Sequence, residues 1–331
     1  MTGYLRLGLA ALVLLSHTGI TINGLNPGVI AVIIFYMLAG GVVTHLWHDI
    51  LPQGKGKLRA FYTDRILRIF PLYLYIASLT AIFILITGYG SPSFQPLATL
   101  SNILIIPLSY FMFIDNSILT DPTWWLIPQA WSLGTELQAY LMLPFILIYK
   151  RAQLPVLIIS ISIYTAANLN IIHTDHYGYR LLPGIFFMFL IGSILKQESR
   201  RSIISTPSNW LLLLATINYL ILHCTSGFQH VYTQETLVGI LIGIPLLRLA
   251  SATNIKLPHN KTAASLSYGV FLSHFLVIWF LDYSGAIEQH TLQYYAVLMA
   301  LTLAISYSGA YLVEKRINTI RMRSGLKLTS K

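Results

Sequence analysis

Apolar residues run along the chain in long, nearly unbroken stretches that short polar loops separate. Stretches of about 15 to 22 residues are long enough, as helices, to approach the thickness of a bilayer core. The pattern predicts an all-α fold, a polytopic membrane helix bundle of about ten transmembrane helices. The predicted spans are residues 5–23, 28–48, 69–88, 130–149, 154–172, 181–195, 209–224, 234–250, 263–283 and 292–313.

One apolar stretch does not fit this pattern. Residues 102–114, with the sequence NILIIPLSYFMFI, are too few to cross a bilayer comfortably and include Pro107. Irregular backbone at membrane depth is tolerated only where protein or a water-filled cavity covers it. We therefore expect a re-entrant or interfacial segment here, within a long loop.

Composition agrees with a membrane protein and excludes several kinds of site. Hydrophobic residues make up 55% of the chain, charged residues only 10%, and the mean hydropathy is +0.67. No small-x-small cleavage site follows the first span, so we expect that span to be retained. The single cysteine, Cys224, excludes an internal disulfide and a thiolate metal cluster. Neither a glycine-rich phosphate loop nor an H-E-x-x-H pair is present, and we expect no metal and no permanently bound cofactor.

Basic residues are distributed unevenly over the predicted loops. With a cytoplasmic N-terminus, every lysine and arginine except Arg180 falls on the inner side, as short inner loops require. The pattern predicts cytoplasmic termini, a transmembrane domain at 1–314 and a basic tail at 315–331. The net charge of +10 then suits an inner face beside anionic lipid, so we expect contact with membrane lipid and not with nucleic acid.

Three ionisable residues well inside predicted spans are candidates for a functional role, because each is costly there without a partner or a water-filled cavity: His17, Glu136 and His274. Two interpretations of His17 stand, an imidazole satisfied by a neighbouring hydroxyl or a functional group. A buried carboxylate must protonate or find a cation or an imidazole, which favours a functional role for Glu136. Ser132, Glu136 and Tyr140 recur at helical spacing and line one face.

Counting residues from the predicted outer ends of their spans gives a depth for two of these groups. His17 and Glu136 each lie six residues from an outer end. At 1.5 Å per residue, both fall roughly 9 Å below the outer boundary. The two side chains are therefore predicted to share one layer of the membrane.

The first predicted span carries a cation and an imidazole on one face. The eleven positions from Arg6 to His17 turn the helix by about 1100°, three turns plus roughly 20°, and separate the two side chains by about 16 Å along the axis. Between them the face carries Ala10 and Val13, which leave room for a thin chain.

A second pair of cations precedes the third span. In FYTDRILRIFPLYLY, Arg65 and Arg68 stand three positions apart on one helical face, just before Pro71. One interpretation is anchoring to lipid headgroups at the inner face. The other is a bidentate clamp on the phosphates of a cytoplasmic ligand.

Four stretches of this chain resemble signatures of the acyltransferase-3 family of integral membrane acyltransferases. The first is R-x10-H, at Arg6 and His17, and the second is R-x-x-R-I-x-P-x-Y, at residues 65–73. The third is WSLGTELQAYLMLP at 131–144 and the fourth SYGVFLSH at 267–274. They occur in the family's order and extend over nearly the whole chain.

The sequence departs from the family pattern at two positions. Ala39 stands where the family often has serine, and Ala139 stands where an aromatic residue is frequent. Both departures bear on the fit of the substrate more than on the chemistry.

The resemblance implies O-acyl transfer, usually of acetyl, from cytoplasmic acyl-CoA to a hydroxyl of a carbohydrate or lipid-linked glycan for the cell surface. It implies a multi-pass protein of the bacterial cytoplasmic (inner) membrane. His17 is then expected to act as general base or to carry a transient acyl group, with Glu136 as its partner. The CoA phosphates are expected on Arg6, Arg65 and Arg68. Further polar site candidates are Tyr73, Trp131, Ser132, Tyr140, Tyr268 and His274.

Two other classes of function are open at this point. A transporter or flippase of a glycan precursor would use Glu136, His17 and His274 as a proton relay and acylate nothing. A structural subunit of a glycan-assembly complex would need no chemistry. The chain shows no inverted repeat, which counts against the transporter, and the four motifs count against both.

Overall fold

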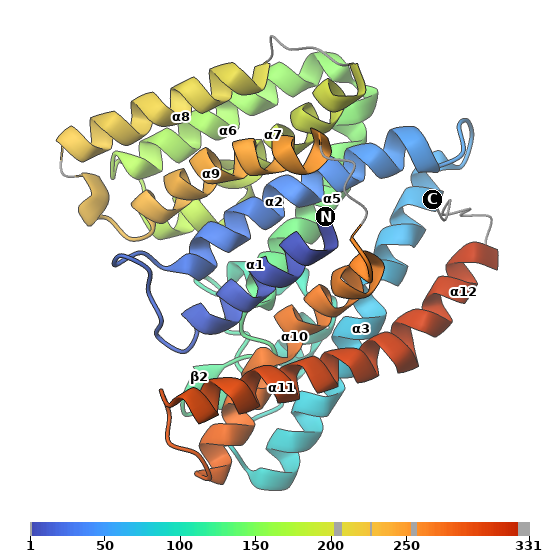
Figure 1. Cartoon of the computed structure of the whole chain (residues 1–331), viewed down its shortest axis with the longest axis vertical. Coiled ribbons are helices and arrows are strands. Elements are labelled where there is room, and N and C mark those ends of the chain that lie inside the picture. Colours follow the sequence, from blue (N-terminus) through green and yellow to red (C-terminus); the bar gives the residue numbers. More distant parts are fainter. Residues whose placement is uncertain (1, 202–206, 226, 253–256, 324–331) are drawn as a thin grey trace. The chain divides into compact units, whose positions relative to one another are not determined.

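The structure is a computed structural model that describes residues 2–201, 207–225, 227–252 and 257–323. A helix occupies all or most of each of the ten predicted spans, and Figure 1 labels these helices. Contacts within the chain divide it into two compact units. The first unit contains residues 15–58 and 135–257, and the second contains residues 2–14, 59–134 and the chain from 258 onward.

The first unit is a helical bundle in which α7 contacts most of the other helices. Its elements are α2 (Pro27–His45), η1 (Leu46–Ile50), the greater part of α5 (Ala130–Ile148), η3 (Lys150–Ala152), α6 (Gln153–Asn168), η4 (His176–Arg180), α7 (Leu182–Arg201), α8 (Pro207–Cys224), η5 (Gly227–Gln229) and α9 (Thr233–Ala252). Of these, η1 and η4 are single turns of π-helix. α7 packs against α2, α6, α8 and α9, so its apolar residues are covered on all sides.

Small residues allow α2 and α7 to cross in backbone contact. A Cβ atom on Gly40 would lie 1.8 Å from the carbonyl oxygen of Phe189, and one on Gly192 would lie 1.7 Å from a carbonyl oxygen of α2. One turn beyond Gly40, Thr44 donates a hydrogen bond of 2.7 Å to the hydroxyl of Ser193. Lipid provides no hydrophobic driving force between helices, so close packing and interhelical hydrogen bonds of this kind hold the pair together.

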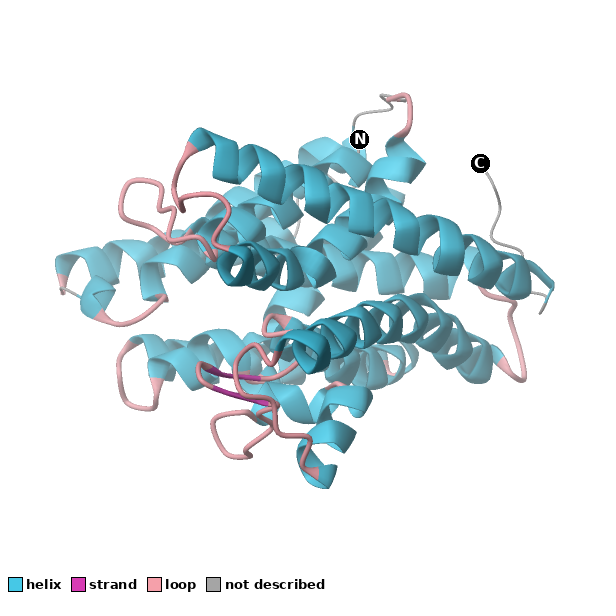
Figure 2. Cartoon of the chain, turned by 90° about the horizontal axis from the view of Figure 1, so that it is seen from below, coloured by secondary structure: helices cyan, strands magenta, loops and turns pink. Residues whose placement is uncertain are grey.

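The second unit contains the greater part of α1 (Thr2–Ser16) and the start of α5. Its other elements are α3 (Lys57–Thr87), α4 (Pro96–Leu104), η2 (Ile106–Tyr110), β1 (Leu119–Thr120), β2 (Thr123–Trp124), α10 (Asn260–Ser284), α11 (Leu292–Gly309), η6 (Ala310–Glu314) and α12 (Lys315–Arg323). β1 and β2 form a short antiparallel hairpin, drawn in magenta in Figure 2. α10 packs along α11, which continues through the π-turn η6 into α12.

Asn102 organises the long loop between α3 and α5. Its side-chain nitrogen donates to the carbonyl oxygens of Ala98 and Asn116, both at 2.9 Å. Its side-chain oxygen accepts from the backbone nitrogen of Leu126 at 2.9 Å. Tyr73 of α3 donates to the carbonyl oxygen of Asn102 at 2.6 Å, so this tyrosine fastens the loop to α3.

The segment 102–114, predicted to be re-entrant or interfacial, contains the end of α4 and a short turn but no helix long enough to cross a membrane. α4 ends at Leu104, Ile105 takes a φ of +67°, and only the short 3-10 turn η2 follows. A positive φ at a β-branched residue interrupts any continuous helix. The position of this segment relative to a membrane stays a prediction.

Seven helical stretches of the described chain are long and apolar enough to cross a membrane. They are Pro27–Ile50, Lys57–Thr87, Ala130–Ile148, His176–Ser199, Thr233–Ala252, Asn260–Ser284 and Leu292–Thr319. α1 is apolar but shorter, and α6 and α8 lie outside this set. A multi-pass helical membrane fold follows, whereas the count of ten spans and the cytoplasmic termini stay predictions.

The predicted basic tail at 315–331 begins as helix α12. Arg321 of α12 is buried and donates to the carboxylate of Asp64 on α3. This part of the predicted tail is therefore joined to α3 of its own unit. Residues 324–331 lie outside the described residues, as does Lys256, which the charge argument also places on the inner side.

Candidate active site

His17 directly follows α1, which ends well short of the predicted residue 23. The backbone nitrogen and the hydroxyl of Thr18 both donate to the carbonyl oxygen of Leu15, at 3.1 and 2.7 Å. Gly19 then takes a φ of +83°, a conformation that ends a helix and favours glycine. His17 is therefore exposed at a turn and does not lie within a helix. The equal-depth argument assumed a helix to residue 23 and loses its basis.

Glu136 lies in the second turn of α5, half-buried. Tyr140, one turn further along, donates from its hydroxyl to Oε1 of Glu136. This hydrogen bond shows that the two side chains share one face of α5, as their spacing predicts. Ser132, the third member of that predicted face, donates instead to the carbonyl oxygen of Gln129 at 2.9 Å.

Arg180 ends the π-turn η4 and is held from several directions. Its Nε lies 2.8 Å from each carboxylate oxygen of Asp175. Its guanidinium carbon lies 5.3 Å from the ring centre of Tyr179 and 5.9 Å from that of Tyr232. An ion pair and two cation–π contacts fix this side chain before any ligand arrives.

Electrostatic interactions connect these residues into one polar cluster of the first unit. The charge of Arg180 acts on the imidazole of His17. Arg180 and Glu136 both act on the phenol of Tyr36 in α2, which is buried. We call His17, Tyr36, Glu136, Tyr140 and Arg180 the histidine cluster. It combines a potential base, a carboxylate and a fixed positive charge.

Sequence reasoning did not include Arg180 among the site residues. The signal was present, because Arg180 is the one basic residue that the charge pattern leaves outside. The sequence pattern indicated no acidic or aromatic partner for Arg180 on the outer side, so its role was not recognised. The structure supplies partners in Asp175 and in the two tyrosine rings.

The two motif arginines of α3 lie in the second unit, and both are engaged with carboxylates. Asp64 is fully buried between two guanidiniums. Nε and Nη2 of Arg65 donate to its Oδ2, the former at 3.0 Å. Nε and Nη2 of Arg321 donate to its Oδ1, the former at 3.1 Å. Asp64 thus joins α3 to α12.

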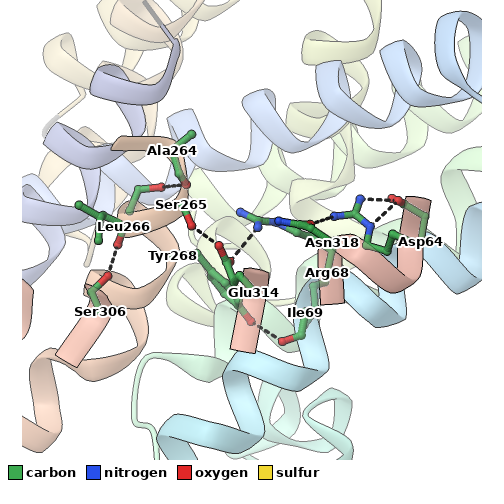
Figure 3. Close-up of polar contacts among 12 residues, drawn as sticks. Asp64, Arg68, Ile69, Ala264, Ser265, Leu266, Tyr268, Ser306, Glu314 and Asn318 are labelled. Carbon is green, nitrogen blue, oxygen red and sulfur yellow. Dashed lines mark hydrogen bonds and ion pairs between the residues drawn. The ribbon is translucent and has the colours of Figure 1, made fainter. Parts of the chain in front are cut away.

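Arg68, one turn further along α3, contacts a different carboxylate. Its Nη1 donates to Oε1 of Glu314 at 2.8 Å, and the hydroxyl of Ser265 donates to Oε2 of the same group. The ring of Tyr268 lies 5.8 Å from the guanidinium carbon of Arg68, and its hydroxyl donates to the carbonyl oxygen of Ile69 at 3.1 Å. Figure 3 shows these contacts. We call Asp64, Arg65, Arg68, Glu314 and Arg321 the arginine cluster.

Arg6 also belongs to the second unit, half-buried on α1. The N-terminal end of that helix is fastened to the start of α10. The backbone nitrogen of Gly3 donates to the side chain of Asn260 at 2.9 Å, and the hydroxyl of Tyr4 donates to the carbonyl oxygen of Pro258 at 2.7 Å. The sharing of one ligand by Arg6, Arg65 and Arg68 stays a prediction.

The remaining candidates have structural contacts within the second unit. His274 is fully buried, and its Nδ1 donates to the carbonyl oxygen of Val270 at 3.1 Å, which assigns the proton to that nitrogen. The rings of Phe271 and Phe275 lie beside it. Trp131 is buried near the start of α5. The expected relay of His274 with His17 and Glu136 stays a prediction.

Comparison with known proteins identifies the family. The model of the Acyltransferase domain family, acyltransferase 3, matches residues 3–311. An uncharacterized protein of Aquifex aeolicus is 40% identical over 219 residues, which cover 63% of this chain and 98% of that protein. An uncharacterized protein of Haemophilus influenzae is 25% identical over 235 residues, covering 65% of this chain and 91% of that protein. No solved structure matches the chain. With nearly its whole length matched, this multi-pass chain belongs to the acyltransferase 3 family of membrane acyltransferases.

Proposed function

We propose that the protein transfers an acyl group from cytoplasmic acyl-CoA to a hydroxyl of a carbohydrate or lipid-linked glycan. The acyl group that we propose is acetyl. The observation that carries the proposal is the family match over residues 3–311. A bacterial cytoplasmic membrane is the proposed location, in keeping with the inner-side excess of lysine and arginine.

His17 is the proposed general base. It takes the proton of the acceptor hydroxyl as that oxygen attacks the thioester carbonyl carbon. The new C–O bond forms, the C–S bond breaks, and the imidazolium returns the proton to the departing CoA thiolate. Exposure of His17 at the turn after α1 supports this role, because a base must reach its substrate.

Two further residues of the histidine cluster assist this step. Glu136 stabilises the imidazolium, as a carboxylate does for a histidine base in other acyl-transfer sites. Arg180 supplies positive charge for the oxyanion that develops on the thioester oxygen, and its fixed position avoids reorganisation during the reaction. The transient acyl-histidine route uses the same groups and differs in having His17 attack the thioester first.

Mass spectrometry of surface glycans from cells with and without the gene tests the proposed acceptor and acyl group together. The proposal predicts that deletion of the gene removes an acyl ester from the glycan. For an acetyl ester, the glycan mass falls by that of one acetyl group. Glycans of unchanged acylation but reduced surface abundance would contradict it and would favour a flippase.

A further inference from the structure

The arginine cluster contains three guanidiniums and two carboxylates, and the two carboxylates are held differently. Asp64 is fully buried and receives donors from both Arg65 and Arg321. Glu314 receives one guanidinium nitrogen, from Arg68, and one hydroxyl, from Ser265. The Arg68 side chain is 27% exposed, against 10% for Arg65 and 7% for Arg321. Arg68 is therefore the arginine of the cluster that a ligand from solvent reaches most easily.

Glu314 reaches Arg68 because of a local change in helix geometry. It is the last residue of η6, a single π-turn between α11 and α12. An extra residue in one turn changes the direction of the side chains that follow, and such turns are frequent at functional sites. Figure 3 shows the Glu314 carboxylate between Ser265 of α10 and Arg68 of α3.

The space beside this ion pair is small. Arg68, Glu314, Asn318 and Arg321 line a recess between α3 and the η6–α12 segment, with a volume of about 10 Å³. That volume holds about one water molecule. A phosphate group is larger than this recess, so it can contact Arg68 there only if a lining side chain moves aside.

We propose that Glu314 occupies on Arg68 the place of a ligand phosphate, and that a phosphate-bearing ligand binds by exchanging one ion pair for the other. This inference rests on the proposed function for the identity of the ligand, the phosphates of acyl-CoA. With three guanidiniums against two carboxylates, the arginine cluster carries one excess positive charge. A phosphate of charge near −2 competes for Arg68 better than a carboxylate of charge −1.

The exchange explains why the motif arginines are already paired. Three guanidiniums held close together without counterions would repel each other strongly in a poorly solvated site. Glu314 and Asp64 supply the negative charge that offsets this repulsion. Only Glu314 is replaced on binding, so it lowers the affinity for the ligand and sets its selectivity for dianions.

Binding of CoA to the purified full-length protein in lipid nanodiscs tests the inference. Glu314→Gln keeps the shape of the side chain but removes the competing charge, and CoA is expected to bind roughly tenfold more tightly. Ser265→Ala keeps the carboxylate but removes its second anchor, so a smaller gain of the same sign is expected. Unchanged or weaker CoA binding in both variants would overturn the inference.

A matched control comes from the first unit. Glu198 likewise accepts hydrogen bonds from a serine, Ser208, whose hydroxyl also accepts from Arg248. Glu198→Gln removes the same charge at a different place, and its CoA affinity should equal that of the wild type. A gain equal to that of Glu314→Gln would show a general effect of net charge and would contradict the exchange.

Inorganic pyrophosphate as a second probe separates this inference from the proposed function. If wild-type protein fails to bind CoA, acyl-CoA is not the donor. The exchange still predicts tighter pyrophosphate binding by Glu314→Gln and by Ser265→Ala. Should Glu314→Gln fail to fold, as judged by its thermal unfolding, Ser265→Ala decides, and equal pyrophosphate affinity in that variant and the wild type would sink the inference.

Discussion

The hydroxyl of Thr135 donates a hydrogen bond of 2.9 Å to the backbone carbonyl of Arg180. Thr135 directly precedes Glu136 on α5, and Arg180 is the last residue of η4. The bond therefore holds the part of α5 that carries Glu136 against the end of η4 that carries Arg180. Changes at either residue are expected to affect the same reaction step.

Replacement of Arg180 tests its role in that step. Arg180→Met should lower kcat at least tenfold, because the developing oxyanion loses its positive charge. It should also move the acid limb of the pH profile of kcat/KM to higher pH, because the imidazolium of His17 forms more easily without a positive neighbour. Arg180→Lys should restore part of the rate and the original acid limb.

The control for this experiment is Arg248→Met. Arg248 is an arginine of the same unit that contacts Ser208, outside the histidine cluster. Its variant should keep the wild-type pH profile. An Arg180→Met enzyme with an unshifted acid limb would mean that Arg180 does not act on His17 during catalysis.

Glu136→Gln should keep the shape of the site and leave acyl-CoA binding nearly intact. The variant should nevertheless lose most of the rate of acyl transfer. The double variant of His17→Ala and Glu136→Gln should lose little more of the acyl-transfer rate than His17→Ala alone. The effects of substitutions at residues that act as a unit are not additive. Tyr140→Phe removes one donor to Glu136 and should reduce the rate by a smaller factor. Steady-state kinetics of these four variants and the wild type measures these effects. Full additivity of the two losses in the double variant would rule out the pairing of His17 with Glu136.

Single Arg→Lys changes at positions 65 and 68 separate a phosphate clamp from a lipid anchor. Lysine keeps the charge but loses the planar fork, so acyl-CoA binding should weaken while membrane insertion is unchanged. Arg65→Lys should also lower the thermal stability more than Arg68→Lys, because Arg65 donates twice to the fully buried Asp64. Unchanged CoA affinity in both variants would leave the arginines as anchors only.

The crossing of α2 and α7 makes a prediction about stability. Gly40→Ala would bring a Cβ atom to 1.8 Å from the carbonyl oxygen of Phe189, so the helices must separate. The expected cost is about 1–3 kcal/mol, as for other overpacked sites. Gly8→Ala on α1 is the control, because no atom of the described residues lies within 4 Å of the added Cβ. Thermal unfolding in detergent should show a lower transition temperature for Gly40→Ala alone.

Much of the fold follows from the apolar pattern of the sequence. A helix lies at every predicted span, because long apolar stretches in lipid must satisfy their backbone groups internally. The early end of α1 was missed, because apolar Ile20 and Ile22 extend the hydrophobic window past the turn that Thr18 and Gly19 impose. Window averages detect the length of a stretch and not its local turn.

The candidate site could be predicted in part only. Motif spacing selected His17, Glu136, Arg65 and Arg68 as candidates, since each spacing is local in the chain, and their roles stay predictions. The contacts of Arg68 with Glu314 and of Arg321 with Asp64 join positions 246 and 257 residues apart. No periodicity within one helix indicates such pairs. A charge count treats Arg321 as part of a solvated tail, whereas its side chain is buried.

Acyl transfer by purified protein tests the central claim most directly. Wild-type protein in nanodiscs is given labelled acetyl-CoA and a glycan acceptor, beside His17→Ala and His17→Gln variants that insert normally into the membrane. The account predicts labelled acetyl ester on the acceptor and free CoA with the wild type, and neither with the two variants, because the proton acceptor is gone. Labelled ester formed at more than a few per cent of the wild-type rate by either variant would contradict it, because catalysis would then proceed without His17.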